Sequence, residues 1–401
     1  MASLTEQRLS RRGFLSFASR SAGGILGLAM VNRPASGMNP FVPSFWPNDE
    51  RRAELEERLG VSFSPRKKYE LVFDLESHVD EQEKVVTEAR ENVRALGAAL
   101  REQVPIGLST EEQIRYLDRF IQPKVGKIAA ATNGPPKQYF LSELFRSLRG
   151  TCILSGAYCA LSEEAGLHDV SPVLTPGHLL VGVRYKKFFD PMPGEGECQG
   201  SFKTPDDYSH VGAQARANYC LSELNAEQVA GLVLNSVAAY QFRAKKDVAA
   251  AIKSANNGIF AWGTYPSLHL TLASANIKRG NLEGAKASIL TAMKLDPDFA
   301  PANLTAAVWC EANADIAMTP YQKKMYLEKG LMFATVAANM DSHYVGARAA
   351  VGRLQRALGM EKESVASYVR AGNLSKETTL RFGNARCYAP TPDPKVVMSS
   401  L

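Results

Sequence analysis

The segments AIKSANNG at residues 251–258 and AKASILTA at residues 285–292 decide how the C-terminal half of this chain folds. In both segments the first, fifth and eighth residues are small or apolar, and the two segments lie 34 residues apart. Gly280 falls between them, where a turn is expected, and Pro297 follows the second segment. A fixed offset of this length predicts paired helices that stack on their neighbours to cover their apolar faces.

Two later segments, 330–337 and 364–371, carry small or aromatic residues at the same three positions. The first lies 45 residues after 285, so one unit is lengthened by about 11 residues, which we expect in the turn Asn313–Tyr321. An alanine-rich helical bundle also has small residues every three or four positions, but it does not generate a shared 34-residue offset. We therefore predict tetratricopeptide-like repeats over residues 223–386, followed by a proline-containing tail, 387–401.

The first 37 residues have the order of features expected of an export signal. Ser10-Arg11-Arg12-Gly13-Phe14-Leu15 precedes a Gly-rich apolar run, residues 22–31, and small residues at 34–37. The apolar run is too short to span a bilayer of about 30 Å. The motif resembles a twin-arginine signal, which implies an exported, periplasmic protein. Residues 38–50 contain three prolines and are expected to form a linker.

Charge and composition argue against several classes of protein. The formal net charge is +6, and four of those charges come from residues 1–37, so the remainder is nearly neutral. We find no Lys/Arg stripe with interleaved aromatics, which argues against a nucleic-acid partner. No later run is apolar and long enough for a membrane span, and no phosphate-binding loop or metal-ligand spacing indicates a cofactor.

Residues 51–222 change character along their length. The first part is helical in pattern, with a capping box from Ser109 to Glu112. A helix-like stretch from Cys152 to Ala165 ends at Gly166, and three short apolar runs follow, separated by turn residues. Helix followed by strands is an α+β pattern.

Three residues in this region suit nucleophilic chemistry. Cys152 follows Gly150 and Thr151 at a helix start, where the helix dipole favours the thiolate that attacks carbonyl carbons. His178 follows a Pro-Gly turn at the start of one strand, and Asp190 lies near the end of the next. Antiparallel neighbours of this kind allow the carboxylate to orient the imidazole, as in an acyl-transfer triad.

The residues around this constellation resemble the transglutaminase-like superfamily. The resemblance rests on YFLSELFRSLRGTC at residues 139–152, Tyr158, the AGL of residues 165–167 and the PGH of residues 176–178. Its nearest branch is the SirB-type proteins, which join such a core to tetratricopeptide repeats. The resemblance implies a papain-like core, a cysteine helix on a small antiparallel sheet, with Cys152 as nucleophile, His178 as acid/base and Asp190 as its orienting acid.

Two functions follow from these observations. The first is an exported cysteine hydrolase or acyl transferase that acts on an amide or isopeptide bond of a peptide or protein, with repeats that bind a partner. The alternative is an inactive scaffold that binds other proteins.

The chain has six cysteines, none of them in a CxxC pair. Cys198 and Cys220 are candidates for a disulfide in an oxidising compartment, although buried free thiols are the interpretation we prefer. Cys159 lies seven residues after Cys152, on the same helix face, and is expected in the core.

Overall fold

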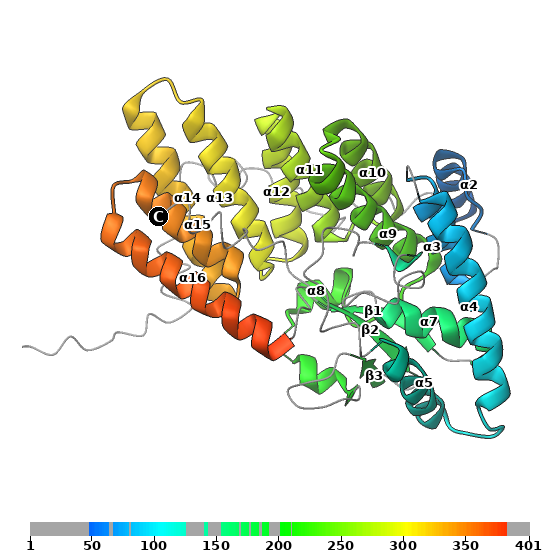
Figure 1. Ribbon diagram of the computed structural model, residues 1–401. Helices are drawn as coiled ribbons and strands as arrows, with labels where there is room; N and C mark the ends of the chain where they lie inside the picture. Colours follow the sequence, from blue (N-terminus) through cyan, green and yellow to red (C-terminus); the bar gives the residue numbers. More distant parts are fainter. Residues whose placement is uncertain are drawn as a thin grey trace, which may run out of the picture. The chain divides into compact units, whose positions relative to one another are not determined.

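The computed structural model describes much of the chain in detail (Figure 1). The described residues are 48–63, 67–79, 82–125, 140–142, 154–167, 170–175, 178–183, 187–191, 201–209 and 211–382. Of these, 48–49, 122–125, 154, 178 and 375–382 are described by backbone alone. The expected export signal and the expected tail lie outside the described residues, as does most of the expected linker. Residues 51–401 form one compact unit.

The first part of this unit, residues 51–224, is called here the α/β part. Its helices are α2 (Asn48–Leu59, which starts in the expected linker), α3 (Lys68–Ser77), α4 (Glu83–Gln103), α5 (Thr110–Val125) and α7 (Leu154–Ala165). The predicted capping box is present at the start of α5, where the Ser109 N–H donates to the Glu112 carboxylate at 2.8 Å. Helix α7 ends as expected at Gly166, which has a φ of +74° that favours glycine.

The strands form one antiparallel sheet. They are β1 (Val170–Thr175), β2 (His178–Val183), β3 (Lys187–Asp190) and β4 (Ser201–Lys203), hydrogen-bonded in the order β1-β2-β3-β4. The first three match the predicted apolar runs, because prolines and glycines delimit those runs. Strand β4 was not predicted: it has three half-buried residues, and only its pairing with β3 identifies it.

The sheet is followed by the short helices η3 (Pro205–Tyr208) and α8 (Ala213–Asn218). The rest of the described chain, residues 226–382, is called here the helical array. Its helices are α9 (Ala226–Tyr240), η4 (Gln241–Lys245), α10 (Val248–Ala261), α11 (Pro266–Arg279), α12 (Leu282–Leu295), α13 (Ala300–Asp315), α14 (Pro320–Met340), α15 (Val345–Ala357) and α16 (Glu361–Phe382). The described part of the chain is thus mostly helical, with one small sheet.

The helical array is a repeat of helix pairs. Helices α9 and α10, α11 and α12, α13 and α14, and α15 and α16 pack against each other within the pairs, and each second helix packs on the first helix of the next pair. Two helix starts recur after 34 residues: Val248 begins α10 and Leu282 begins α12, and Pro266 begins α11 and Ala300 begins α13. The 34-residue offset found in the sequence is therefore the separation between equivalent helices of successive pairs.

The unit that contains α13 and α14 is longer, as predicted, but the added residues are mainly helical. Helix α14 has 21 residues and α13 has 16, whereas α11 and α12 have 14 each. The added residues were expected in the turn Asn313–Tyr321. They do lie at the turn end of this helix pair, but most of them extend α14 and are not loop residues.

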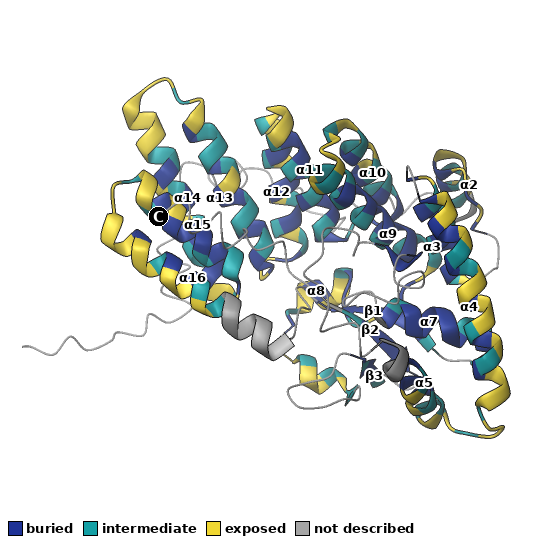
Figure 2. Ribbon diagram, viewed as in Figure 1, coloured by how far each residue is buried: buried dark blue, intermediate teal, exposed yellow. Residues whose placement is uncertain are grey.

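Small side chains fill the interfaces of the helical array. Buried stretches alternate with exposed ones along the helices of the array (Figure 2). Ala273, Ala285, Ala292 and Ala307 are completely buried, and Gly330 lies against Leu354 and Cys310. Because these residues have little or no side chain, the helix axes approach closely.

The α/β part and the helical array share a hydrophobic core. Leu55 and Leu59 of α2 and Leu174 of β1 belong to the same buried cluster as Trp262 and Leu268. A buried hydrogen bond of 2.6 Å joins the Tyr219 hydroxyl to the Asp296 carboxylate between α12 and α13. The core is therefore continuous across residue 222, where the sequence analysis placed a domain boundary.

Candidate functional site

Two of the three predicted catalytic residues lie at strand ends: His178 begins β2, and Asp190 ends β3. The two strands are antiparallel, with Val181 paired to Phe189 and Val183 to Lys187. Continued by one residue, this register sets Asp190 opposite Leu180, two residues from position 178. Strand positions 178 and 190 are thus diagonal neighbours on one face of the sheet.

Helix α7 begins at the same end of the sheet. The Ser155 hydroxyl, in the first turn of α7, donates a hydrogen bond of 2.6 Å to the carbonyl of Leu179 in β2. Ser155 is itself buried. Cys152, the predicted nucleophile, lies outside the described residues, three positions before Ser155 in the sequence. The described chain therefore brings the start of α7, the start of β2 and the end of β3 to one end of the sheet.

The two faces of the sheet have different neighbours. Val181 and Phe189 face α7, and the Phe189 ring lies 5.7 Å from that of Tyr158. Leu180 and Phe188 lie on the other face, where the Phe188 ring is 5.9 Å from that of Tyr208. By register, positions 178 and 190 belong to this second face, so the body of α7 is across the sheet from them and only its N-terminal end is close.

Asp190 is half-buried and lies near Tyr208 of η3. Burial, and secondly the negative charge of Asp190, raise the pKa of the Tyr208 hydroxyl above its ordinary value. The phenol therefore stays protonated at neutral pH beside the carboxylate.

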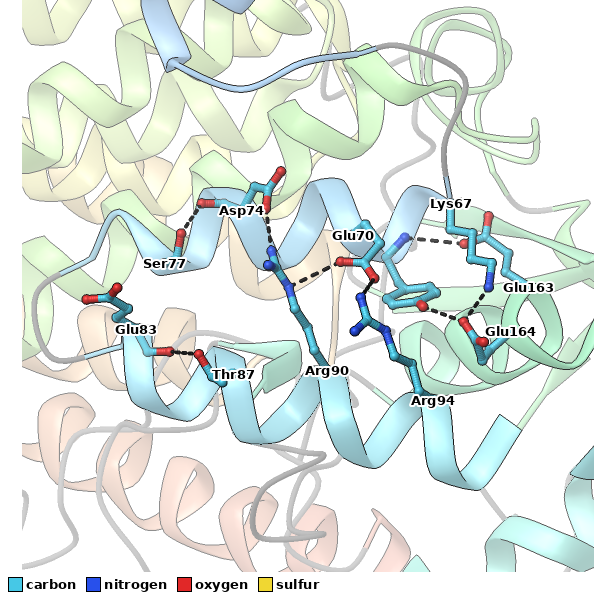
Figure 3. Close-up of polar contacts among 11 residues, drawn as sticks. Lys67, Glu70, Asp74, Ser77, Glu83, Thr87, Arg90, Arg94, Glu163 and Glu164 are labelled. Atoms are coloured by element: carbon cyan, nitrogen blue, oxygen red, sulfur yellow. Dashed lines mark hydrogen bonds and ion pairs between the residues drawn. The ribbon is translucent and has the colours of Figure 1, made fainter. Parts of the chain in front are cut away.

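The C-terminal half of α7 is anchored by charged groups from α3 and α4 (Figure 3). Glu164 pairs with Lys67 and accepts from the Tyr69 hydroxyl, and Glu163 accepts from the Tyr69 N–H at 3.3 Å. Arg101 of α4 donates to the last carbonyls of α7, which have no partner within the helix.

Arg90 joins α4 to α3 through Glu70 and Asp74. Helices α3 and α4 are thereby held together, and their contacts with Glu163, Glu164 and Ala165 fix the orientation of α7.

Two buried carboxylates link further segments to this region. The Tyr158 hydroxyl of α7 donates to Asp118 of α5 at 2.6 Å. Glu76, at the end of α3, accepts the backbone N–H groups of Leu141 and Ser142 at 2.6 and 2.9 Å with its two oxygens. Residues 141 and 142 are helical, so Glu76 accepts hydrogen bonds from two helical N–H groups.

Ser155, Asp118 and Glu76 are functional-region residues that were not predicted from the sequence. Acid residues alone do not mark a buried acid, because Glu76 lies in a helix with the half-buried acids Glu70 and Asp74. The available signal was helical spacing, which places Glu76 three residues after the buried Phe73 and seven after the buried Tyr69, on the same face of α3.

The three cysteines in the described part of the chain are poor nucleophile candidates. Cys159, Cys220 and Cys310 are buried free thiols, and burial raises the pKa of each, that of Cys310 to about 12. The prediction that Cys159 belongs to the core is confirmed. Cys198, the candidate disulfide partner of Cys220, lies outside the described residues.

Among the described residues, no group of three His, Cys, Asp or Glu side chains is arranged to hold a metal ion. No helix in that part of the chain combines the length and the apolar character needed to cross a membrane.

Comparison with known proteins adds structural similarity alone. No model of a known protein family matches the chain, and no curated protein matches it. The chain is similar in structure to a thermophilic TPR protein of Thermus thermophilus, with 20% sequence identity and a TM-score of 0.35. The similarity covers 39% of this chain and 81% of that protein. This score is too low to support a conclusion, so the repeat character rests on the helix bounds described above.

Proposed function

We propose that the chain is an exported thiol acyl transferase or hydrolase with a papain-like, transglutaminase-type site, joined to a tetratricopeptide-like array that binds a polypeptide. One observation carries the catalytic part: the Ser155–Leu179 hydrogen bond and the β2–β3 register bring the start of α7, position 178 and Asp190 to one end of the sheet. These are the three chain positions that flank or carry the predicted triad.

In the proposed reaction, the Cys152 thiolate attacks the carbonyl carbon of an amide or isopeptide bond. The C–N bond then breaks, and the imidazolium of His178 gives its proton to the departing amine. Water or a second amine attacks the resulting thioester and releases the thiol. Asp190 orients His178 throughout, and the helical array holds the polypeptide that carries the bond.

Site-resolved alkylation of the folded chain by iodoacetamide tests this function. We expect Cys152 to react at pH 6, where an unpaired thiol with a pKa of about 8.5 is almost fully protonated. His178→Ala should slow this reaction by about tenfold or more, since the imidazolium stabilises the thiolate. Buried Cys159, Cys220 and Cys310 are internal controls and should stay unmodified.

The second candidate is the scaffold without catalysis. One observation favours the scaffold. Positions 178 and 190 lie on one face of the sheet, and the body of α7 lies on the opposite face. A Cys152 that reacts no faster than a free thiol, and is indifferent to His178→Ala, would remove the enzyme and leave the scaffold.

Export is tested separately. Replacing Arg11 and Arg12 by lysine should leave the chain inside the cell if the leader is a twin-arginine signal. A chain that is exported equally well after both substitutions contradicts this part of the proposal.

A further inference from the structure

The turns that join the two helices within each pair lie along one edge of the helical array. Each pair is a hairpin packed beside the next, so its internal turn neighbours the internal turns of adjacent pairs. The connections α11–α12 and α13–α14 are at the upper edge in Figure 1. We name this surface the turn edge and define it by residues 243–247, 278–283, 315–324 and 356–363.

Exposed basic residues recur along the turn edge. Lys245 and Lys246 occupy the first turn, Lys278 and Arg279 the second, and Lys323 and Lys324 the third. In each of these three turns basic residues outnumber the exposed acids, which are Asp247, Glu283 and Asp315. The fourth turn carries as many acidic as basic residues. Helix packing thus gathers into one row cations from three turns that are separate in the chain, such as Lys245, Lys278 and Lys323.

The third turn also projects beyond its neighbours. Helices α12 and α14 end at equivalent residues, Leu295 and Met340, so the seven additional residues of α14 lie at the turn end. At 1.5 Å per residue they place the start of α14 about 10 Å past the start of α12, and α13 is also longer than α11, with 16 residues against 14.

The projecting turn exposes three large apolar side chains. Ile316, Met318 and Tyr321 are 69%, 95% and 79% exposed. The helix dipole explains basic residues near helix C-termini, but it does not explain apolar residues at this tip. Burying them would remove a large apolar area from water, so they indicate a contact surface.

We propose that the turn edge binds the surface of an anionic phospholipid membrane, with Ile316, Met318 and Tyr321 inserted among the headgroups and the lysines paired with lipid phosphates. A narrow convex tip suits a bilayer, which deforms around it, better than a protein interface, whose apolar core is broad and tightly packed. Tyrosine is enriched at headgroup depth, and each lysine near an anionic surface contributes about 1 kcal/mol. This contact is peripheral and requires no spanning helix.

Co-sedimentation of the full chain with vesicles tests the proposal. We expect binding to vesicles that contain phosphatidylglycerol, little binding to phosphatidylcholine alone, and weaker binding at high salt. A variant with Ile316→Ser, Met318→Ser and Tyr321→Ser should bind at least about tenfold more weakly. Lys323→Glu with Lys324→Glu should also weaken binding.

Matched controls lie elsewhere on the chain. Leu290 and Val369, which are 51% and 55% exposed near the middle of α12 and α16, should tolerate replacement by serine without loss of binding. Lys84→Glu, at a side chain of α4 that is 89% exposed, is the control for charge. Every variant keeps residues 1–50, so differences among them report the turn edge and not the leader.

Vesicle binding that is unchanged in the serine variant of the tip overturns the proposal, as does a full chain that fails to sediment with anionic vesicles. Loss of binding in the lysine variant alone also overturns it, since the turn edge would then be a site for acidic polypeptides. None of these outcomes depends on the reactivity of Cys152.

Discussion

The α/β part and the helical array are stabilised by different kinds of contact. In the α/β part, large buried side chains such as Tyr158 and Phe189 meet, and carboxylates such as Glu76 and Asp118 accept hydrogen bonds inside the core. In the helical array, the buried positions between helices are largely alanine and glycine. The first region is therefore sensitive to the loss of a polar partner and the second to added volume.

The largest expected effect is at Glu76. Glu76→Ala leaves two buried amides without acceptors, at about 1–3 kcal/mol each, and should lower the free energy of unfolding by about 3 kcal/mol or more. Chemical denaturation measures this change. Glu88→Ala, on the exposed face of α4, is the control and should change stability by less than about 0.5 kcal/mol. Equal effects of both substitutions would show that the buried hydrogen bonds of Glu76 do not stabilise the α/β part.

In the helical array, a single methyl group should have opposite effects at two glycines. A Cβ on Gly231 in α9 would lie 2.6 Å from the Trp262 Cβ, which no rotamer change can move, and we expect Gly231→Ala to cost about 2 kcal/mol. A Cβ on Gly372 in α16 meets nothing within 4 Å, so Gly372→Ala should stabilise the chain by about 0.5–1 kcal/mol. Thermal unfolding of the two variants gives the sign, and stabilisation by Gly231→Ala would contradict close packing at this interface.

Two buried serines of α7 separate the effect of a hydrogen bond from the effect of burial. Ser155→Ala removes the hydrogen bond to Leu179 and should cost about 1 kcal/mol. Ser162 is equally buried, and its hydroxyl has no hydrogen-bond partner within the described structure. Ser162→Ala should therefore be neutral or slightly stabilising. Chemical denaturation of the two variants gives the difference in their midpoints. A larger loss of stability in Ser162→Ala than in Ser155→Ala would show that packing, and not the hydrogen bond, stabilises α7 here.

The smallest effect is a pH dependence in the helical array. Burial lowers the pKa of His269 below its ordinary value of 6.5, while a hydrogen bond to the Gly263 carbonyl opposes this. Because the folded state binds the proton less well than the unfolded state, stability is full above pH 6.5 and falls as the pH drops below it. The slope is at most about 1.4 kcal/mol per pH unit. His269→Gln should flatten the stability profile between about pH 7 and pH 5, and an unchanged slope would assign it to other groups.

Local signals explain which elements were predictable. Gly166 and the Pro176-Gly177 turn delimit α7 and the first two strands, and the 34-residue offset locates the helices of the array. Strand β4 and the helical lengthening of α14 were missed, since neither has a local signature. For the candidate site, the order of Cys152, His178 and Asp190 came from the sequence, whereas the sheet face of positions 178 and 190 came from strand register.

The periodicity of the helical array and the first three strands of the α/β part were predictable from the sequence, because both depend on residues that are close in the chain. Tertiary structure alone decided three further features: the two amides that Glu76 satisfies, the continuity of the core across residue 222, and the row of cations beside an exposed apolar tip. These depend on contacts between residues far apart in the sequence, and burial or exposure is set only when helices pack.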